Sequence, residues 1–442
     1  MTHRARRSRA KKPIVFLAAR YMEQLVVSLF LIFFALEFVV EFILNELNLR
    51  HVRARRAHQD IPEFFRGKLS ADEYDKSVEY TLAKGRFQRW SEIYGRVITL
   101  VILFGGVLSF FDQFAGLVAQ QFSLGVYGQG IIFCLAVAVY FTVAGLMTDL
   151  YSTFALEAKF GFNKMTLGLY LTDKLKGLVL GLLIGVPFLF VILWLMQATG
   201  SLWWIWAFVF ISVFQLVMIV IFPTFIAPWF NKFEPLKEGE FRDRILALAD
   251  KVGFKTSGIF SMDGSKRSSH SNAYFTGIGK SKRIVLFDTL LEQMNMEQGL
   301  AVLAHEMGHY KMKHIQRMLI VQTVFLLVGL YVLSLLLDFA PLYSAFGLTP
   351  SHHAALVLFS LLSGAVTFYL GPMMNLLSRK HEYEADRFAS LTLHDRKPME
   401  EALINLTVKN LSNLTPHPWY SAYHYSHPTP AERISAIRQS AV

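Results

Sequence analysis

Seven long apolar stretches constrain the fold of this chain more than any other feature. Each approaches the length of about 20 residues that an α-helix needs to cross the hydrocarbon core of a bilayer. They lie at residues 25–44, 94–111, 130–149, 176–198, 202–223, 317–338 and 353–375. Because lipid cannot pair with backbone polar groups, an apolar stretch that crosses it must be helical. The sequence therefore predicts a mainly α-helical membrane protein with seven spans.

Composition supports this prediction. The chain has 442 residues, of which 53% are hydrophobic and 17% charged, whereas a soluble globular protein carries about 25% charged residues. A single cysteine, Cys134, excludes an internal disulfide and a cysteine-rich metal site. Much of the net charge of +11 lies in the N-terminal tail and in loops beside apolar stretches. It therefore predicts contact with lipid headgroups, and not with nucleic acid.

The first stretch follows a basic tail but is too long for the core of a signal peptide, and no small-residue cleavage site follows it. We expect a retained first span. It is the least pure stretch, because Glu37 and Glu41 lie one helical turn apart on one face. Carboxylates inside a membrane usually face the interior of a bundle or a water-filled cavity. The alternative is a shorter or partly interfacial first span.

Loop charge predicts the orientation of the bundle. No Lys or Arg occurs in segments 112–129, 199–201 and 339–352, whereas both are frequent in segments 45–93, 150–175, 224–316 and 376–442. Seven crossings place all the basic segments on one face, which the positive-inside rule assigns to the cytoplasm. The same count places the basic N-terminal tail on the opposite face. The internal segments outnumber the tail, so we follow them.

The spans divide the chain into four parts. Residues 1–223 hold five spans and a helical loop at 45–93, where Ser70-x-x-Glu73 predicts a capping box. Residues 224–316 form a soluble insertion, residues 317–375 hold the last two spans, and residues 376–442 form a second soluble part.

The insertion contains three short apolar or β-branched segments, which predict strands at 257–262, 272–276 and 282–287. A turn at Gly277-Ile278-Gly279 separates the last two. A helix then starts after Asn295, a predicted N-cap with Gln298 three residues later. The pattern allows this helix to continue unbroken into the span at 317.

This helix carries the motif His305-Glu306-Met307-Gly308-His309. On a helix, two imidazoles four residues apart share one face, and a carboxylate lies beside them. This arrangement predicts two ligands for one catalytic zinc ion, with Glu306 as the general base. The glutamate would take a proton from the attacking water and deliver it to the leaving amine. The alternative is a helix whose histidines are only packed or solvated.

A catalytic zinc site needs a third protein ligand, and Glu382 is the candidate. The last span returns the chain to the same membrane face just before this residue. Glu384, two residues along a helix, points elsewhere, whereas Asp386 lies one turn after Glu382 and can accept a hydrogen bond from a ligating imidazole. The alternative for Glu382 and Asp386 is a solvated helix end. His314 and His381 have no assigned role.

Taken together, these residues resemble the type I CAAX prenyl endopeptidases, seven-span zinc metallopeptidases of the gluzincin kind. The shorter HtpX-type membrane proteases resemble the chain more distantly. The resemblance covers nearly the whole chain and is carried by segments 160–166, 272–277, 282–290, 305–309, 378–386 and 427–433.

The resemblance implies roles that spacing alone does not. The spans would enclose a chamber capped by the protease domain, and Glu382 would be the third zinc ligand with Asp386 as its partner. Asn272, Ala273 and Tyr274 would belong to an edge strand that binds the substrate backbone. His427 and Arg433 would stabilise the oxyanion of the tetrahedral intermediate. Judged from the residues alone, His427 is a turn residue before proline and Arg433 a solvated helix start.

We therefore predict an integral membrane zinc metalloendopeptidase that cuts near the C-terminus of prenylated CAAX-type or other membrane-associated proteins. Its partners would be a peptide or protein substrate and the lipid bilayer; the oligomeric state is not predicted. The alternatives are an HtpX-like quality-control protease and a non-catalytic scaffold or transporter. We expect a bacterial inner membrane, or the endoplasmic reticulum membrane in a eukaryote, with the site on the cytoplasmic side.

Overall fold

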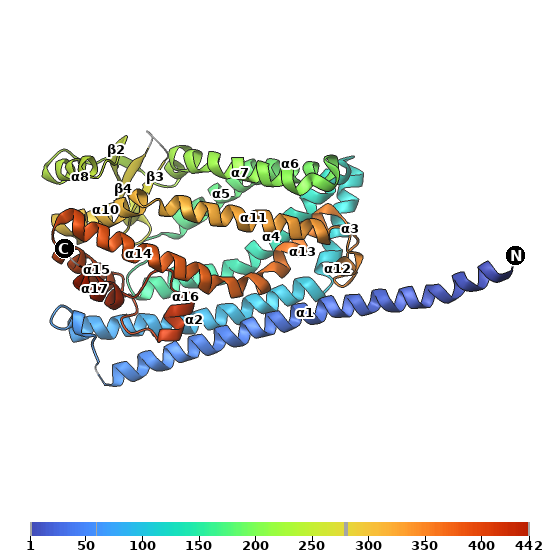
Figure 1. Cartoon of the computed structure of the whole chain (residues 1–442), viewed down its shortest axis with the longest axis horizontal. Helices are drawn as coiled ribbons and strands as arrows, with labels where there is room; N and C mark the ends of the chain where they lie inside the picture. The colour runs from blue at the N-terminus through green and yellow to red at the C-terminus, as the bar shows by residue number, and fades with distance from the viewer. Residues whose placement is uncertain (1, 59, 278–281, 441–442) are drawn as a thin grey trace.

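A computed structural model describes residues 2–58, 60–277 and 282–440, with side chains from residue 17 onward. Long helices lie side by side in one bundle, and a small sheet and the C-terminal helices gather at one end of it (Figure 1). Six helical runs are long and apolar enough to cross a membrane, and the bent pair α2 (Ala71–Phe104) and α3 (Val107–Gln121) supplies a seventh. The predicted helical membrane fold is confirmed.

Most helices of the bundle extend beyond the predicted spans. The first, α1 (Thr2–Ala57), reaches past the end of the bundle that lies opposite the sheet (Figure 1). The others are α4 (Gly125–Tyr151), α5 (Leu167–Leu180), α6 (Val186–Ala198), α7 (Trp203–Ile221), α11 (His314–Leu336), α13 (His352–Thr367) and α14 (Gly371–Leu393), with the short α12 (Ala340–Ser344) between two of them. The last run passes from α13 through a 3₁₀ turn into α14, which leaves the apolar region and enters the soluble part.

The second span was predicted as one continuous helix at 94–111, and the structure differs. The helix breaks at Gly105 and Gly106, and the two halves meet at an angle of 56°. Gly106 has φ +75, a left-handed conformation that glycine adopts without the strain of a side chain. At its other end α2 begins in the predicted capping box, where the Ser70 side chain and Glu73 each accept from the other's backbone amide. The predicted capping box is thus confirmed.

A four-stranded sheet forms in the insertion, from β1 (Phe233–Pro235), β2 (Gly258–Met262), β3 (Ala273–Thr276) and β4 (Arg283–Phe287). The strand order is β1-β2-β4-β3; the central pair is parallel and both edge pairs are antiparallel. The three predicted strands are confirmed. The strand β1 was not predicted; it contains a proline, a residue that only an edge strand accepts readily. Of the predicted turn after β3, residues 278 and 279 lie outside the described residues.

One hydrophobic core joins the soluble parts. The remaining helices are α8 (Glu240–Lys251), α9 (Asp288–Gln293), α10 (Met296–Lys311), α15 (Lys397–Lys409), α16 (Pro418–His424) and α17 (Pro430–Gln439). Side chains from the insertion, such as Leu303, pack in the same cluster as Leu403 of α15, Ile434 of α17 and Phe65 of the 45–93 loop. Segments far apart in the sequence therefore build a single unit at one end of the bundle.

The helix α10 begins as predicted, with a capping box between Asn295 and Gln298. It ends at Lys311, and α11 starts anew at His314, so unbroken continuation into the membrane is wrong. Lys313 lies between them with φ +59, a left-handed conformation that ends a right-handed helix. The turn brings His314 back against the end of α10.

Glu37 and Glu41 of α1 face the inside of the bundle. Glu37 pairs with Arg96 of α2 at 3.1 Å, and Glu41 lies 3.3 Å from His424 of α16. Both carboxylates line a cavity of about 480 Å³ between α1, α2, α13, α14 and α16. They are placed as expected for charges inside a membrane. The partly interfacial alternative for the first span is not supported.

Candidate active site

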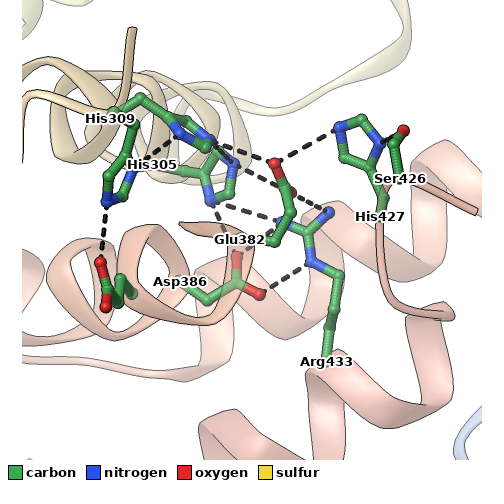
Figure 2. A network of polar contacts seen from close by, with 9 residues as sticks. His305, His309, Glu382, Asp386, Ser426, His427 and Arg433 are labelled. Atoms are coloured by element: carbon green, nitrogen blue, oxygen red, sulfur yellow. Dashed lines mark hydrogen bonds and ion pairs between the residues drawn. The ribbon is translucent and has the colours of Figure 1, made fainter. Parts of the chain in front are cut away.

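The three predicted metal ligands meet between α10 and α14 (Figure 2). One ligand atom from each of His305, His309 and Glu382 lies within 4.8 Å of the others. The two imidazole Nε2 atoms are 3.1 Å apart. Glu382 Oε1 lies 3.2 Å from Nε2 of His309, and Oε2 lies 3.5 Å from Nε2 of His305. Three donors thus converge on one point.

Close packing of the two helices brings these donors together. Gly308 faces α14, where a β-carbon would come within 3.2 Å of the Ala385 α-carbon and 3.1 Å of Phe388 Cδ1. Glycine and alanine at this contact allow the helix backbones to approach. The Gly308 position lies between the two histidines of the motif, so the contact sets the distance from both histidines to Glu382.

The donor set suits a zinc ion. Two imidazole nitrogens and one carboxylate oxygen form a set that leaves a fourth position open in catalytic zinc sites. Glu382 is buried, and its Oε2 accepts no hydrogen bond among the described residues, although the guanidinium of Arg433 lies 3.2 Å from it as an ion pair. A buried carboxylate oxygen without a hydrogen bond is costly. A cation held among the three donors would satisfy it, so these residues fit a metal.

Asp386 holds the first histidine of the motif. Its Oδ1 lies 2.8 Å from Nδ1 of His305, and the side chain is buried (Figure 2). An ionised carboxylate can accept a hydrogen bond from Nδ1–H, and a proton on Nδ1 leaves the lone pair of Nε2 directed at the other donors. The 2.8 Å distance is the one expected for the predicted contact, and Nη2 of Arg433 lies 3.3 Å from the same Nδ1 atom.

Arg433 reaches the site from α17, but its main contacts were not predicted. Its guanidinium donates two hydrogen bonds to Asp386, from Nε to Oδ2 at 2.8 Å and from Nη2 to Oδ1 at 2.6 Å (Figure 2). Its Nη1 lies 3.2 Å from Oε2 of Glu382. Arg433 therefore balances the charge of two buried carboxylates. The solvated helix start that its local sequence favours is wrong.

His427 lies at the open side of the site. Its Nε2 is 3.4 Å from Oε1 of Glu382, and Nδ1 is 2.9 Å from the Ser426 hydroxyl (Figure 2). The imidazole is 63% exposed, so it can meet a ligand that enters from outside. The structure thus brings both residues of the 427–433 segment to the ligands.

Glu306 lies on α10 directly after the first ligand. Burial raises the pKa of its carboxyl, although the nearby charges of His305 and His309 act in the opposite direction. A carboxyl in such surroundings can both accept and release a proton in a catalytic cycle. Glu384, by contrast, turns away from the ligands as predicted, and its Oε2 lies 2.9 Å from Nε2 of His314.

The strand β3 is an edge strand of the sheet, with no second strand paired to it among the described residues. The Phe287 amide donates to the carbonyl of Asn272 at 3.0 Å, which makes Asn272 a hydrogen-bonded partner of β4. Because pairing alternates along an antiparallel ladder, the backbone groups of Ala273 and Phe275 point to the open edge. The Ala273 amide donates to the Asn272 side chain at 2.8 Å. Tyr274 packs its ring against Phe287, on the side of the strand opposite Ala273.

Two residues at the site have contacts that the sequence did not predict. Gly308 lies inside the motif, where only the contact with α14 shows why a glycine is needed. His314 lies five residues after His309 and beyond a helix break, yet its Nδ1 is 3.0 Å from Nδ1 of His309. The sequence places His314 just before a predicted span. It does not predict the turn at Lys313 that directs the His314 ring toward His309.

A bundle of membrane helices that carries this constellation defines an integral membrane metalloendopeptidase. Two family models match consecutive parts of the chain: “CAAX prenyl protease N-terminal, five membrane helices” at residues 51–232, and “Peptidase family M48” at residues 235–441. The CAAX prenyl protease 1 homolog of Arabidopsis thaliana is 36% identical over 398 residues, which are 88% of this chain and 93% of that protein.

CAAX prenyl protease 1 of Saccharomyces cerevisiae is 38% identical over 410 residues, covering 85% of this chain and 88% of that protein. The crystal structure of Ste24p from S. mikatae superposes with a TM-score of 0.83 at 35% identity, covering 92% of this chain and 98% of that one. The chain belongs to the CAAX prenyl protease family of M48 peptidases. The scaffold and transporter alternatives are therefore set aside.

Proposed function

We propose that His305, His309 and Glu382 hold one zinc ion, and that the protein uses it to cut prenylated CAAX-type proteins near their C-termini. The observation that carries the proposal is the convergence of these three donors within 4.8 Å, beside the carboxylate of the same motif. The insertion 224–316 and the C-terminal part 376–442 would act as one protease unit, because they share one core.

When bound, zinc would polarise the scissile carbonyl and make water more acidic. Glu306 accepts a proton from the attacking water and returns it to the leaving amine. Asp386 keeps His305 in the tautomer that leaves Nε2 free. His427 and Arg433 stabilise the negative charge that develops on the carbonyl oxygen. Of these two, His427 is exposed and able to move toward a substrate, whereas Arg433 also holds Asp386 in place.

The substrate backbone would add to the free edge of β3. Outward backbone groups of Ala273 and Phe275 can pair with an extended peptide without selecting its side chains. The Ala273 amide already donates a hydrogen bond to the Asn272 side chain. When a peptide binds, this hydrogen bond would have to break or become shared with the peptide carbonyl. Tyr274 would act only by keeping its neighbours in the strand, since its side chain packs on the other side of the strand.

We propose that catalysis takes place on the cytoplasmic face. The basic segments 224–316 and 376–442 lie at the same end of the bundle as the site, and the N-terminal end of α1 lies at the opposite end (Figure 1). The membrane would be a bacterial inner membrane or, in a eukaryote, that of the endoplasmic reticulum. Prenylation of the substrate is inferred from the relatives, which are described as CAAX prenyl proteases.

The test is hydrolysis of a fluorogenic farnesylated CAAX peptide by purified protein and by the variant Glu306→Gln. Loss of a general base lowers the rate by roughly 10²- to 10⁴-fold, and zinc content should stay that of the wild type. Glu297→Gln, on the same helix but in an exposed pair with Arg244, is the matched control and should keep full activity. Full activity of Glu306→Gln would overturn the mechanism. Equal cleavage of the unprenylated peptide would overturn the substrate class.

A further inference from the structure

The second histidine of the motif has a partner outside the proposed ligand set. His309 turns Nε2 toward His305 and Glu382, and its other ring nitrogen, Nδ1, lies 3.0 Å from Nδ1 of His314. The far nitrogen of His314, Nε2, lies 2.9 Å from Oε2 of Glu384. A chain of two hydrogen bonds therefore leads from His309 to a carboxylate on α14.

The positions of the protons in this chain follow from the chemistry of the groups. A nitrogen that binds a metal must offer its lone pair, so Nδ1 of His309 carries the ring proton and donates it. His314 must accept at Nδ1, and its own proton is then on Nε2. That proton is donated in a hydrogen bond to Glu384, which has no proton of its own to donate when it is ionised. Each imidazole is thus fixed in one tautomer.

The surroundings hold His314 and Glu384 in these states. His314 is 2% exposed, and its ring stacks on that of His381 with centroids 4.0 Å apart and planes within 10°. Arg317 and Lys380 lie 3.7 and 3.9 Å from the Glu384 carboxylate, where positive charge favours its ionised form. The left-handed turn at Lys313 aims the ring of His314 back at α10.

We propose that His314 and Glu384 are positioning residues for the metal site, which hold His309 in the tautomer and orientation that a ligand needs. They would do for the second histidine what Asp386 does for the first. The inference rests on the proposed metal site of His305, His309 and Glu382. It also assigns a function to the helix break, because His314 is the first residue of the membrane helix α11.

This arrangement couples the metal site to the bilayer. His305 is held by Asp386 of α14 and through it by Arg433 of α17, both outside the apolar part of the bundle. His309 is held through the first turn of α11, a helix that continues into the membrane. A shift of α11 along its axis would therefore act on the hydrogen-bond partner of His309 and not on that of His305.

The experiment measures zinc affinity, by competition with a chromophoric chelator, in the full chain purified in detergent. Loss of a partner of a metal-ligating histidine weakens metal binding by about 10- to 100-fold. We expect a weakening in this range for His314→Phe, which keeps a ring to stack on His381 but cannot accept a hydrogen bond. Glu384→Leu should weaken binding in the same direction. Glu384→Gln should stay close to the wild type, because its amide oxygen still accepts from His314.

The matched control is His353→Phe. His353 is also buried, at 8% exposure, and its Nε2 lies 2.9 Å from Oδ1 of Asp112 at the end of the bundle opposite the metal ligands. This variant loses a buried histidine and its hydrogen bond to a carboxylate, as His314→Phe does, without touching the site. Its zinc affinity should equal that of the wild type.

Cobalt-substituted protein supplies a second readout, because its visible absorption reports ligand geometry. The spectrum should change in His314→Phe and Glu384→Leu and stay unchanged in His353→Phe. The inference is overturned if zinc affinity in His314→Phe falls no more than in His353→Phe. If His314→Phe does not fold, the zinc affinities of Glu384→Leu and Glu384→Gln are compared instead. Equal affinities in these two variants would overturn the inference. A wild-type protein that binds no zinc would instead overturn the proposed function.

Discussion

Gly308 packs against Ala385 so closely that a β-carbon at Gly308 would lie 3.2 Å from the Ala385 α-carbon. This contact brings α10 and α14 to the separation at which three donors converge. Gly308→Val should therefore push the helices apart and lower both zinc affinity and thermal stability, the latter by about 1–3 kcal/mol, as overpacking of a core does. Gly177→Val is the control, because nothing lies within 4 Å of a β-carbon there. Wild-type zinc affinity in Gly308→Val would contradict this account.

Removal of the metal should abolish activity reversibly. Prolonged treatment with a strong chelator should inactivate the protein, and added zinc should restore hydrolysis of the farnesylated peptide, because the three donors converge closely enough to hold one metal ion. Metal analysis should find no zinc in His305→Ala and one zinc per chain in the control His58→Ala, where the histidine is exposed. A chelated protein that keeps its activity would exclude a metal mechanism.

Arg433→Gln should destabilise the fold as well as the site. It leaves Asp386 and Glu382 as buried carboxylates without their cation, and breaking a buried ion pair from one side costs about 3–5 kcal/mol. The measurement is the shift of the thermal unfolding midpoint in detergent. Arg438→Gln on the same helix breaks an exposed pair with Glu400, which should cost no more than about 1 kcal/mol. Equal shifts for the two variants would show that the Arg433 contacts do not contribute.

His427 should affect catalysis without affecting stability. Its side chain is 63% exposed, so His427→Ala removes little packing. Loss of one donor to an oxyanion lowers kcat by about 10²- to 10³-fold, and zinc affinity should change little by comparison. Steady-state kinetics with the farnesylated peptide separate kcat from KM. A change confined to KM would assign His427 to substrate binding and not to the oxyanion.

Strand addition at β3 predicts an alternating response to N-methylated substrates. Only every second amide of a paired peptide points at Ala273 and Phe275. Methylation of those amides should raise KM by roughly 3- to 10-fold, the value of one hydrogen bond. Methylation of the amides between them supplies the control and should have a smaller effect. A response without alternation along the peptide would contradict an edge-strand complex.

The membrane fold could be predicted because the rule behind it is local. Twenty apolar residues must form a helix in lipid whatever surrounds them, so the positions of the spans were readable. The exact ends of the spans, and the breaks within them, could not be predicted. Whether the second span runs straight depends on Gly106 adopting φ +75, which two adjacent glycines permit but do not require. The small strand β1 was missed because it exists only through its pairing with β2.

Within the site, the sequence determined the motif. Two histidines four residues apart on a helix must share a face, so His305 and His309 were paired before any packing was known. Glu382 and Asp386 became candidates from helical spacing and from the return of the last span to the same face, and the family resemblance gave them their roles. Neither inference needed a contact between distant elements in detail.

Tertiary structure alone decided how these groups are held. Arg433 looked like a solvated helix start, and only the docking of α17 places its guanidinium on Asp386. His314 carried no signal beyond its position, because a left-handed turn at Lys313 and the neighbouring α14 direct its ring to His309 and Glu384. Spacing along one helix sets which side chains share a face; the partners that fix their protons come from other helices, and their packing is not encoded in any local pattern.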